Sequence, residues 1–140
     1  MHKSTQELLT ILRNSPNIND YIDNEQENMT QTELHQYLKQ LLSEKKISPS
    51  ELIRCSGLDR TYAYQILSGT KTPSRNKVLA LCFALTLSFE ETQALLKSTG
   101  YPILYARIKN DSIIIFALQH KAALADVNEL LFDFGYEPLC

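Results

Sequence analysis

Four side chains near the middle of the chain have the types and spacing of a hydrogen-bonding surface on one helix. Arg60, Thr61, Tyr64 and Gln65 follow Asp59 at positions that share one face of an α-helix. Arginine and glutamine side chains can make paired hydrogen bonds to the edges of nucleobases. The same polar residue types also occur on any solvated helix surface. A DNA-reading face and a plain polar surface both stay open on these residues alone.

Two short helical patterns on either side of Gly57 would position this row of side chains. Residues 48–51, Ser-Pro-Ser-Glu, combine a capping serine, a proline at the first helical position and an acidic third residue, as at a helix start. Gly57 ends that helix and supplies the positive φ that a steep turn needs. Asp59 can accept hydrogen bonds from the first N–H groups of the next helix, 60–68. The pattern predicts a helix-turn-helix pair whose second helix faces outward with residues 60–65.

Similar signals predict helices along most of the chain. Ser4 precedes a short N-terminal helix, and Ser74 and Ser88 each precede a segment with helical apolar spacing. Residues 31–45 carry one apolar stripe of a further helix. The segment 15–29 is polar, acidic and without periodicity, so we expect a linker or a mobile arm there.

The C-terminal third allows two interpretations. Strand-forming residues from Ile113 to Phe116 would suit a β-hairpin over 103–118 that turns at Asn110-Asp111. However, residues 77–101 and 112–136 align without gaps at an offset of 35 residues, with apolar positions matched. A helix pair that is repeated in this way buries an apolar face against its neighbour. We therefore favour a second helical hairpin and keep the β-hairpin as the alternative.

The overall composition is that of a folded globular protein. Of the 140 residues, 44% are hydrophobic and 21% are charged. No apolar run approaches the roughly 20 residues that a membrane helix needs. Glu7 and Arg13 interrupt the short apolar stretch at the start, which makes it a poor signal peptide. We expect a cytoplasmic protein with no membrane segment.

Positive charge is concentrated around the helix-turn-helix pattern. The formal net charge of the chain is −2, which argues against a wholesale nucleic-acid binder. Residues 48–77 nevertheless carry five cationic and two acidic side chains, whereas residues 1–30 and 78–140 are both net acidic. A locally basic surface is what binding to phosphate requires.

The chain offers little for catalysis or metal binding. Its three cysteines are widely separated and form no CxxC pair, and its three histidines are isolated. We expect Cys55 and Cys82 to be buried as small apolar residues. The common hydrolase, zinc-protease and nucleotide-binding motifs are missing from the sequence. We therefore predict no catalytic residue, no metal site and no cofactor, and we do not expect an enzyme.

The stretch from about Thr32 to Glu91 resembles the helix-turn-helix family of lambdoid phage repressors and Cro, also called the XRE family. It includes the helix before the motif and a trailer after the second helix that is familiar in this family. The trailer residues are Gly69, Pro73, Ser74, Val78, Leu79, Ala84, Leu85 and Leu87. The chain departs from the family at two positions. The family usually has alanine where this chain has Ile53, and isoleucine or valine where this chain has Ala63. Because the two positions face each other, the exchange roughly conserves volume.

The resemblance implies two sets of DNA-contacting residues. Base edges in the major groove would be contacted by Arg60, Thr61, Tyr64 and Gln65. Phosphates would be contacted by Ser50, Tyr62, Ser68, Lys71, Thr72 and Arg75.

Taken together, the sequence predicts an all-α protein with a lambda-repressor-like bundle extended by a C-terminal helical hairpin. The expected parts are an N-terminal helix and acidic linker at 1–30, the DNA-binding domain at 31–95 and a helical extension at 96–140. We expect a transcriptional regulator that binds double-stranded DNA as a homodimer, with the extension serving dimerisation or a protein partner. The alternative is a helical protein-interaction adaptor that has kept the scaffold and lost DNA binding.

Overall fold

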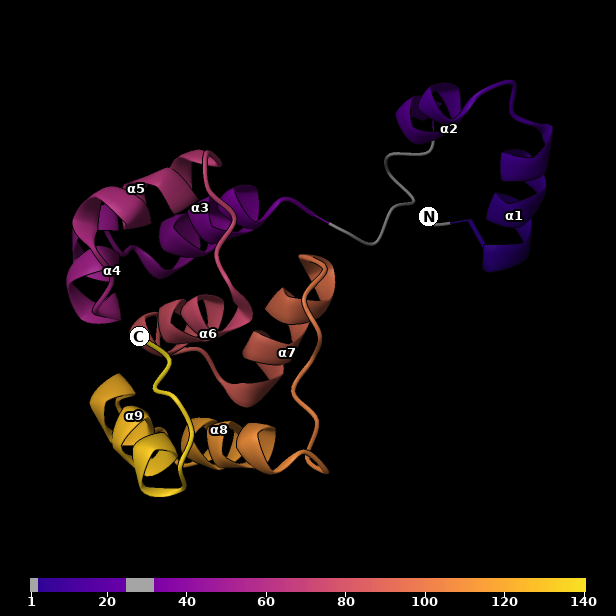
Figure 1. Cartoon of the computed structure of the whole chain (residues 1–140). Helices are drawn as coiled ribbons and strands as arrows, with labels where there is room; N and C mark the ends of the chain where they lie inside the picture. The colour runs from indigo at the N-terminus through magenta and orange to yellow at the C-terminus, as the bar shows by residue number, and fades with distance from the viewer. Residues whose placement is uncertain (1–2, 25–31) are drawn as a thin grey trace. The chain divides into compact units, whose positions relative to one another are not determined.

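The computed structural model describes residues 3–24 and 32–140, and the chain divides into two compact units, Met1–Gln31 and Thr32–Cys140. The first unit contains α1 (Thr5–Asn14) and α2 (Ile18–Asn24). The second contains α3 (Leu34–Lys45), α4 (Pro49–Ser56), α5 (Arg60–Ser68), α6 (Arg75–Ala84), α7 (Phe89–Ser98), α8 (Lys109–Gln119) and α9 (Leu124–Asp133) (Figure 1). The described residues form helices and no strand, so the predicted all-α class is confirmed. No helix among them has the length and apolar character to cross a membrane.

The N-terminal unit is a pair of short helices. As predicted, Ser4 caps α1, because its hydroxyl accepts a hydrogen bond from the Glu7 N–H at 3.2 Å. The expectation of an irregular linker over 15–29 is wrong for residues 18–24, which form α2 and contact α1. The reason is a local cap: the Asn17 side-chain oxygen accepts from the Asp20 N–H at 2.8 Å. The part of that segment beyond Asn24 lies outside the described residues.

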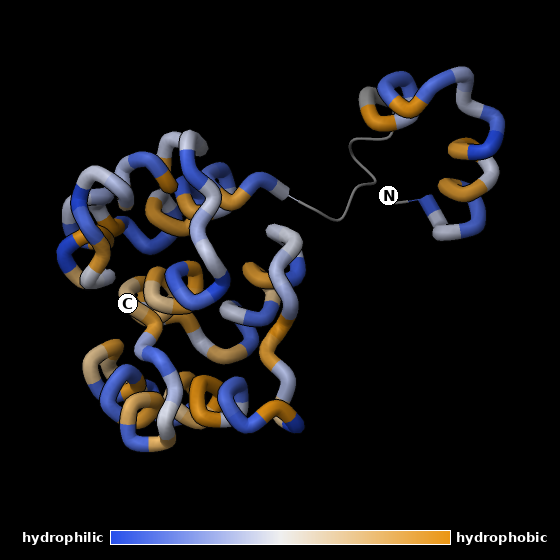
Figure 2. The backbone as a smooth tube through the Cα atoms, viewed as in Figure 1, coloured by the Kyte–Doolittle hydropathy of each residue, from blue (hydrophilic) through white to orange (hydrophobic). Residues whose placement is uncertain are grey.

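The larger unit is built around α6. In Figure 1, α6 and α7 lie between the layer of α3, α4 and α5 and the pair α8 and α9. Every residue of α6 from Val78 to Phe83 is buried, which explains its nearly continuous apolar sequence. Buried side chains from all helices between α3 and α9 join in one core, and Figure 2 shows apolar stretches in each of them. The extension therefore packs on the same core as the helix-turn-helix pair.

The 35-residue repeat is present in three dimensions. Helices α7 and α9 begin and end 35 residues apart, at 89–98 and 124–133. The turns before them also match, since Thr86 and Lys121 have left-handed φ values of 54° and 55°. The helical interpretation of 112–136 is thus confirmed over the bounds of α8 and α9. The residues 101–108 that precede α8 are neither helix nor strand.

An ion pair fastens the connection between α7 and α8 to the start of α6. The guanidinium of Arg75 donates two hydrogen bonds to the carboxylate of Asp111, at 2.9 and 3.0 Å. It also donates to the carbonyls of Pro102 and Ile103, both at 2.9 Å. Asp111 is only 3% exposed and accepts a further bond from the Tyr105 N–H at 3.0 Å. This bidentate geometry is the strong form of an ion pair in proteins.

Gly69 illustrates how tightly α3 packs against the end of α5, and a substitution there is our first prediction. Gly69 has a φ of 85°, and a Cβ at this position would lie 2.7 Å from Cδ2 of His35. Gly135 has a φ of 82° with nothing within 4 Å of such a Cβ, so it is a matched control. Gly135→Ala should lower the free energy of unfolding by about 1–2 kcal/mol, because alanine is strained in the left-handed conformation. Gly69→Ala should cost about 1–3 kcal/mol more, because His35 must move.

Urea unfolding followed by circular dichroism measures both changes. Gly69→Ala combined with His35→Ala should recover part of the extra loss, since the smaller side chain leaves room for the methyl group. Equal losses for the two glycine variants would contradict the packing described for His35.

Candidate nucleic-acid interface

Helix α4 begins as the sequence predicts. The Ser48 hydroxyl accepts a hydrogen bond from the Glu51 N–H at 3.2 Å, and Pro49 occupies the first helical position. The helix buries Leu52, Ile53 and Ser56 and exposes Cys55. The expectation of a buried Cys55 is therefore wrong, because this eight-residue helix fills its core face with the other three side chains.

The turn between α4 and α5 is held from both sides. Gly57 has a φ of 71°, as a steep crossing of the two helices requires. The Ser56 hydroxyl, which is buried, donates to the Ile53 carbonyl at 2.9 Å and accepts from the Leu58 N–H at 3.2 Å. The thiol of Cys140 donates to the Ser56 carbonyl at 3.2 Å. The tail of the chain thus docks at the turn, and the outward side chains of α5 stay accessible.

Helix α5 presents four neighbouring side chains on its outer side. The Asp59 carboxylate caps the helix by accepting from the Tyr62 N–H at 3.1 Å. Its inner side, formed by Ala63, Ile66 and Leu67, is buried. The outer side is formed by Arg60, Thr61 and Tyr64, which are exposed, and Gln65, which is half-buried. We call these four residues the reading face.

The exchange of a large and a small residue between positions 53 and 63 is compatible with the packing of α4 against α5. Ile53 on α4 is 7% exposed and Ala63 on α5 is 2% exposed, so both positions lie in the core. A large residue on one helix and a small one on the other fit without displacing the pair.

Three of the predicted DNA-contacting residues form a cluster across α4 and α5. The guanidinium of Arg60 lies 5.8 Å from the centre of the Tyr64 ring. A hydrogen bond to the Ser50 side chain, together with the charge of Arg60, holds the pKa of the Tyr64 hydroxyl below its ordinary value. The start of α4 and the reading face therefore belong to one continuous surface.

Tyr62 takes a different direction from Tyr64. It is half-buried, and the ammonium of Lys77 lies 4.4 Å above its ring. Through this contact the ammonium of Lys77, a residue of α6, lies next to the helix-turn-helix pair. Lys77 cannot be assigned to this surface from the sequence, because its approach to Tyr62 depends on how α5 and α6 pack.

The remaining predicted phosphate contacts divide into two groups. Ser68 at the end of α5 and Lys71 and Thr72 after it are exposed, and the Ser68 hydroxyl lies 2.8 Å from that of Thr70. Arg75 is instead engaged by Asp111 and two carbonyls inside the fold. We therefore assign Arg75 a structural role and leave it out of the interface that we propose.

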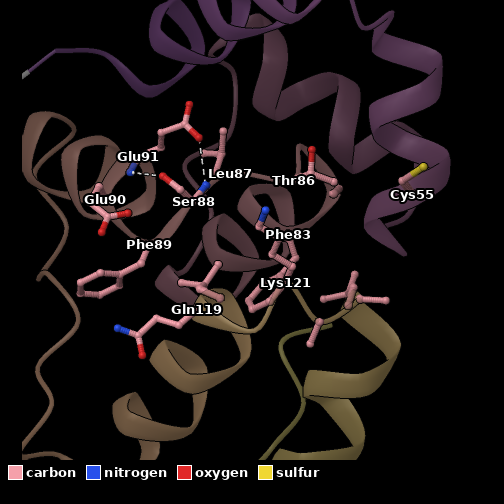
Figure 3. A pocket seen from close by; sticks show the side chains of 15 residues that line it. Cys55, Phe83, Thr86, Leu87, Ser88, Phe89, Glu90, Glu91, Gln119 and Lys121 are labelled. Atoms are coloured by element: carbon pink, nitrogen blue, oxygen red, sulfur yellow. Dashed lines mark hydrogen bonds between the residues drawn. The ribbon is translucent and has the colours of Figure 1, made fainter.

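A separate cavity of about 930 Å³ lies where the α6–α7 turn, the α8–α9 turn and the end of α4 meet (Figure 3). Its lining includes Cys55, Lys121 and the capping box of α7. In that box the Ser88 hydroxyl accepts from the Glu91 N–H at 3.0 Å and Glu91 accepts from the Ser88 N–H at 2.9 Å. Glu91 also lies 3.4 Å from the ammonium of Lys45. None of the predicted DNA-contacting residues lines this cavity.

Comparison with known proteins agrees with this geometry. Residues 37–92 match the family model described as the Cro/C1-type HTH DNA-binding domain. These residues run from α3 to the start of α7 and include the whole reading face. No curated protein and no solved structure shows a significant match to the chain.

The chain therefore carries a Cro/C1-type helix-turn-helix domain at residues 37–92. The family resemblance seen in the sequence is confirmed by this match. Domains of this class bind DNA, and residues 93–140 lie beyond the matched segment.

Proposed function

We propose that this protein is a sequence-specific transcriptional regulator that inserts α5 into the major groove of double-stranded DNA. The observation that carries the proposal is the accessible reading face of Arg60, Thr61, Tyr64 and Gln65 within a Cro/C1-type domain. In this class of domain the second helix of the motif lies in the major groove. Arginine there can pair with guanine and glutamine with adenine.

The surroundings of the reading face support contacts to the phosphate backbone. Ser50 lies at the start of α4, where unpaired N–H groups favour anions. Ser68, the last residue of α5, and Lys71 and Thr72 beyond it are exposed. Tyr62 and its neighbour Lys77 complete the proposed phosphate-contacting set. Such contacts fix the register of the protein on DNA and carry no sequence information.

Lys71 provides a test of this backbone role, which is our second prediction. Lys71→Ala should weaken binding to all duplexes by a similar factor and reduce the slope of log affinity against log salt by about 0.9. Lys97→Ala, which removes an exposed lysine of α7 outside the proposed interface, is the matched control. Fluorescence anisotropy at several salt concentrations measures the slope. An unchanged slope for Lys71→Ala would exclude it from the phosphate contacts.

We further propose that the protein acts as a dimer in the cytoplasm and has no catalytic activity. Domains of this class bind paired half-sites that are one helical turn or a multiple of it apart, which matches a two-fold symmetric protein. The proposed partner is DNA, so the proposed location is the compartment that holds the DNA.

An adaptor function is the second candidate, and one observation favours it. Phe116 in α8, Phe132 in α9 and Phe134 just after α9 are more than half exposed, and exposed aromatic side chains often mark protein-binding surfaces. Under this alternative the helix-turn-helix pair would serve as a scaffold alone.

One experiment separates the two candidates. Purified protein is mixed with fragmented genomic DNA at about 0.15 M salt, where exposed charges are substantially screened, and the retained fragments are sequenced. A regulator should enrich fragments that share a motif with two related half-sites. Retention without any shared motif would contradict sequence-specific reading and favour the adaptor.

A further inference from the structure

The repeated hairpin leaves one of its faces open in the second copy. In the first copy, Leu81 of α6 and the C-cap residue Leu85 lie on one side of the helix and are 2% and 0% exposed. Their counterparts 35 residues later are Phe116, which is 53% exposed, and His120, which is also exposed. The same helix face is therefore covered in one hairpin and uncovered in the other.

Helix α9 contributes to the same surface. Thr99, at the end of α7, is 6% exposed, whereas its counterpart Phe134 is 54% exposed. Leu130 lies one turn before Phe134 and is half-buried, while its counterpart Leu95 is fully buried. The other inward positions, Val127 and Leu131, are buried like their counterparts Thr92 and Leu96, so among these positions the second copy is more exposed only at Leu130 and Phe134.

One contact joins the α8 side of this surface to the α9 side, and a second joins neighbouring rings on the α8 side. The ammonium of Lys109 lies 5.6 Å from the centre of the Phe134 ring, which joins the start of α8 to the end of α9. Further along α8, the rings of Phe116 and His120 are 4.1 Å apart. We define the open face by seven residues on these two helices. They are Lys109, Ile113 and Phe116 of α8 with its C-cap residue His120, and Asp126 and Leu130 of α9 with its C-cap residue Phe134.

The residue types on the open face do not suit permanent contact with water. The outermost of a set of stacked repeats normally presents polar side chains on its outer surface. Here the central positions are Ile113, Phe116 and Phe134. Exposed apolar surface of this kind marks an interaction site.

The charges on the open face favour a second copy of the same chain as the partner. Lys109 lies beside Phe134, and Asp126 precedes Phe134 by eight residues along α9, or about 12 Å of helix. A cation and an acid therefore flank the apolar centre at opposite ends. A two-fold rotation about that centre brings Lys109 of each copy opposite Asp126 of the other. We propose that this protein dimerises through the open face, with Phe116 and Phe134 at the centre and two Lys109–Asp126 pairs at the rim.

The dimer interface adds to the proposed function, and its consequence for DNA binding rests on that function. In Figure 1, α8 and α9 lie across α6 and α7 from the helix-turn-helix pair. A dimer joined there holds its two reading helices far apart. The half-sites in selected DNA should accordingly be separated by more than one helical turn.

The oligomeric state of the full chain in the absence of DNA tests the interface, and this is our third prediction. Sedimentation equilibrium at micromolar concentration should give twice the chain mass of 16.0 kDa for the unmodified protein. Phe116→Glu should give the single-chain mass with an unchanged helical circular-dichroism signal. Phe132→Glu is the matched control, since Phe132 is 73% exposed and lies outside the open face. This control should stay dimeric.

A charge exchange tests the rim pairs separately. Lys109→Glu and Asp126→Lys should each weaken the dimer by roughly tenfold or more, because each places like charges opposite one another. The protein that carries both substitutions should regain most of that affinity. A monomeric unmodified protein, equal effects of Phe116→Glu and Phe132→Glu, or no recovery in the double variant would each overturn the interface. A dimer with this mutational pattern that retains no DNA would contradict the proposed function and support the interface.

Discussion

Arg60→Ala and Gln65→Ala are each expected to weaken binding to the selected DNA site by about 5- to 150-fold. A bidentate pair between a side chain and a base provides about 1–3 kcal/mol of discrimination, and each substitution removes one such pair. Arg60→Ala also removes the cation that lies 5.8 Å from the Tyr64 ring, so its effect should be the larger one. The double variant should approach the affinity for unrelated DNA, because specific and non-specific binding usually differ by about 4–10 kcal/mol.

A gel-shift titration at fixed salt measures this fourth prediction against two matched controls. Arg107→Ala and Gln119→Ala remove the same residue types from exposed positions outside residues 37–92. Both controls should bind as the unmodified protein does, and all variants should keep the helical circular-dichroism signal. Equal losses in the controls and in the α5 variants would mean that the reading face makes no base contacts.

Asp111→Ala is expected to lower the stability of the larger unit by no more than about 3–5 kcal/mol, the usual cost of removing one partner of a fully buried ion pair, since the Arg75 side chain is 24% exposed. It would leave the guanidinium of Arg75 and the N–H of Tyr105 without the carboxylate that binds them. A loss of this size should lower Tm by on the order of 10 °C. Arg75→Lys keeps the charge and loses the two-pronged geometry, so its effect should be intermediate.

The same ion pair gives stability a defined pH dependence. Burial by itself raises the pKa of Asp111, but hydrogen bonds from Arg75 and the Tyr105 N–H, with the charge of Arg75, bring it below its ordinary value of 3.8. A carboxyl whose pKa is lower in the folded state stabilises the fold above that ordinary value. Its contribution is lost as the pH falls through the folded-state pKa.

Asp111→Asn removes this titration and is the appropriate comparison. Urea unfolding between pH 7 and pH 2 should show a steeper acid loss for the unmodified protein than for the variant. Parallel curves would contradict the assignment of acid sensitivity to Asp111, and a loss well under 1 kcal/mol for Asp111→Ala would contradict its role in the fold.

Signals that lie within a few residues of each other predicted most of the helices. Ser4, Ser48 and Ser88 each cap the helix that their spacing indicates, because a cap depends on the three residues that follow it. The same kind of signal was present at Asn17 and Asp20, where an aspartate replaces the usual glutamate. In the sequence, this capping signal is outweighed by the composition of the surrounding acidic segment, which is typical of a linker.

The repeat resolved an ambiguity that local propensity could not. Ile113, Ile114 and Ile115 favour a strand by residue type, yet they lie in α8. Their match to Val78, Leu79 and Ala80 of α6 indicated a helix, because equivalent positions in a repeat share one conformation. Tertiary packing overrides intrinsic propensity at such buried positions.

The reading face could be predicted, whereas several features around it could not. Arg60, Thr61, Tyr64 and Gln65 lie on one side of α5 because helical spacing alone places them there. The partner of Arg75 is Asp111, 36 residues away in the sequence, and no local pattern connects the two. For this reason the sequence suggests that Arg75 contacts phosphate, whereas in the structure it forms an ion pair with Asp111.

Parallel selections from a random duplex library, with the unmodified protein and with Gln65→Ala, test whether α5 contacts bases. If the reading face contacts bases, the two proteins should select the same motif except at one position in each half-site. There the variant should lose its preference, because the missing amide no longer distinguishes adenine. Identical motifs from the two proteins, or no motif from either, would contradict base reading by α5.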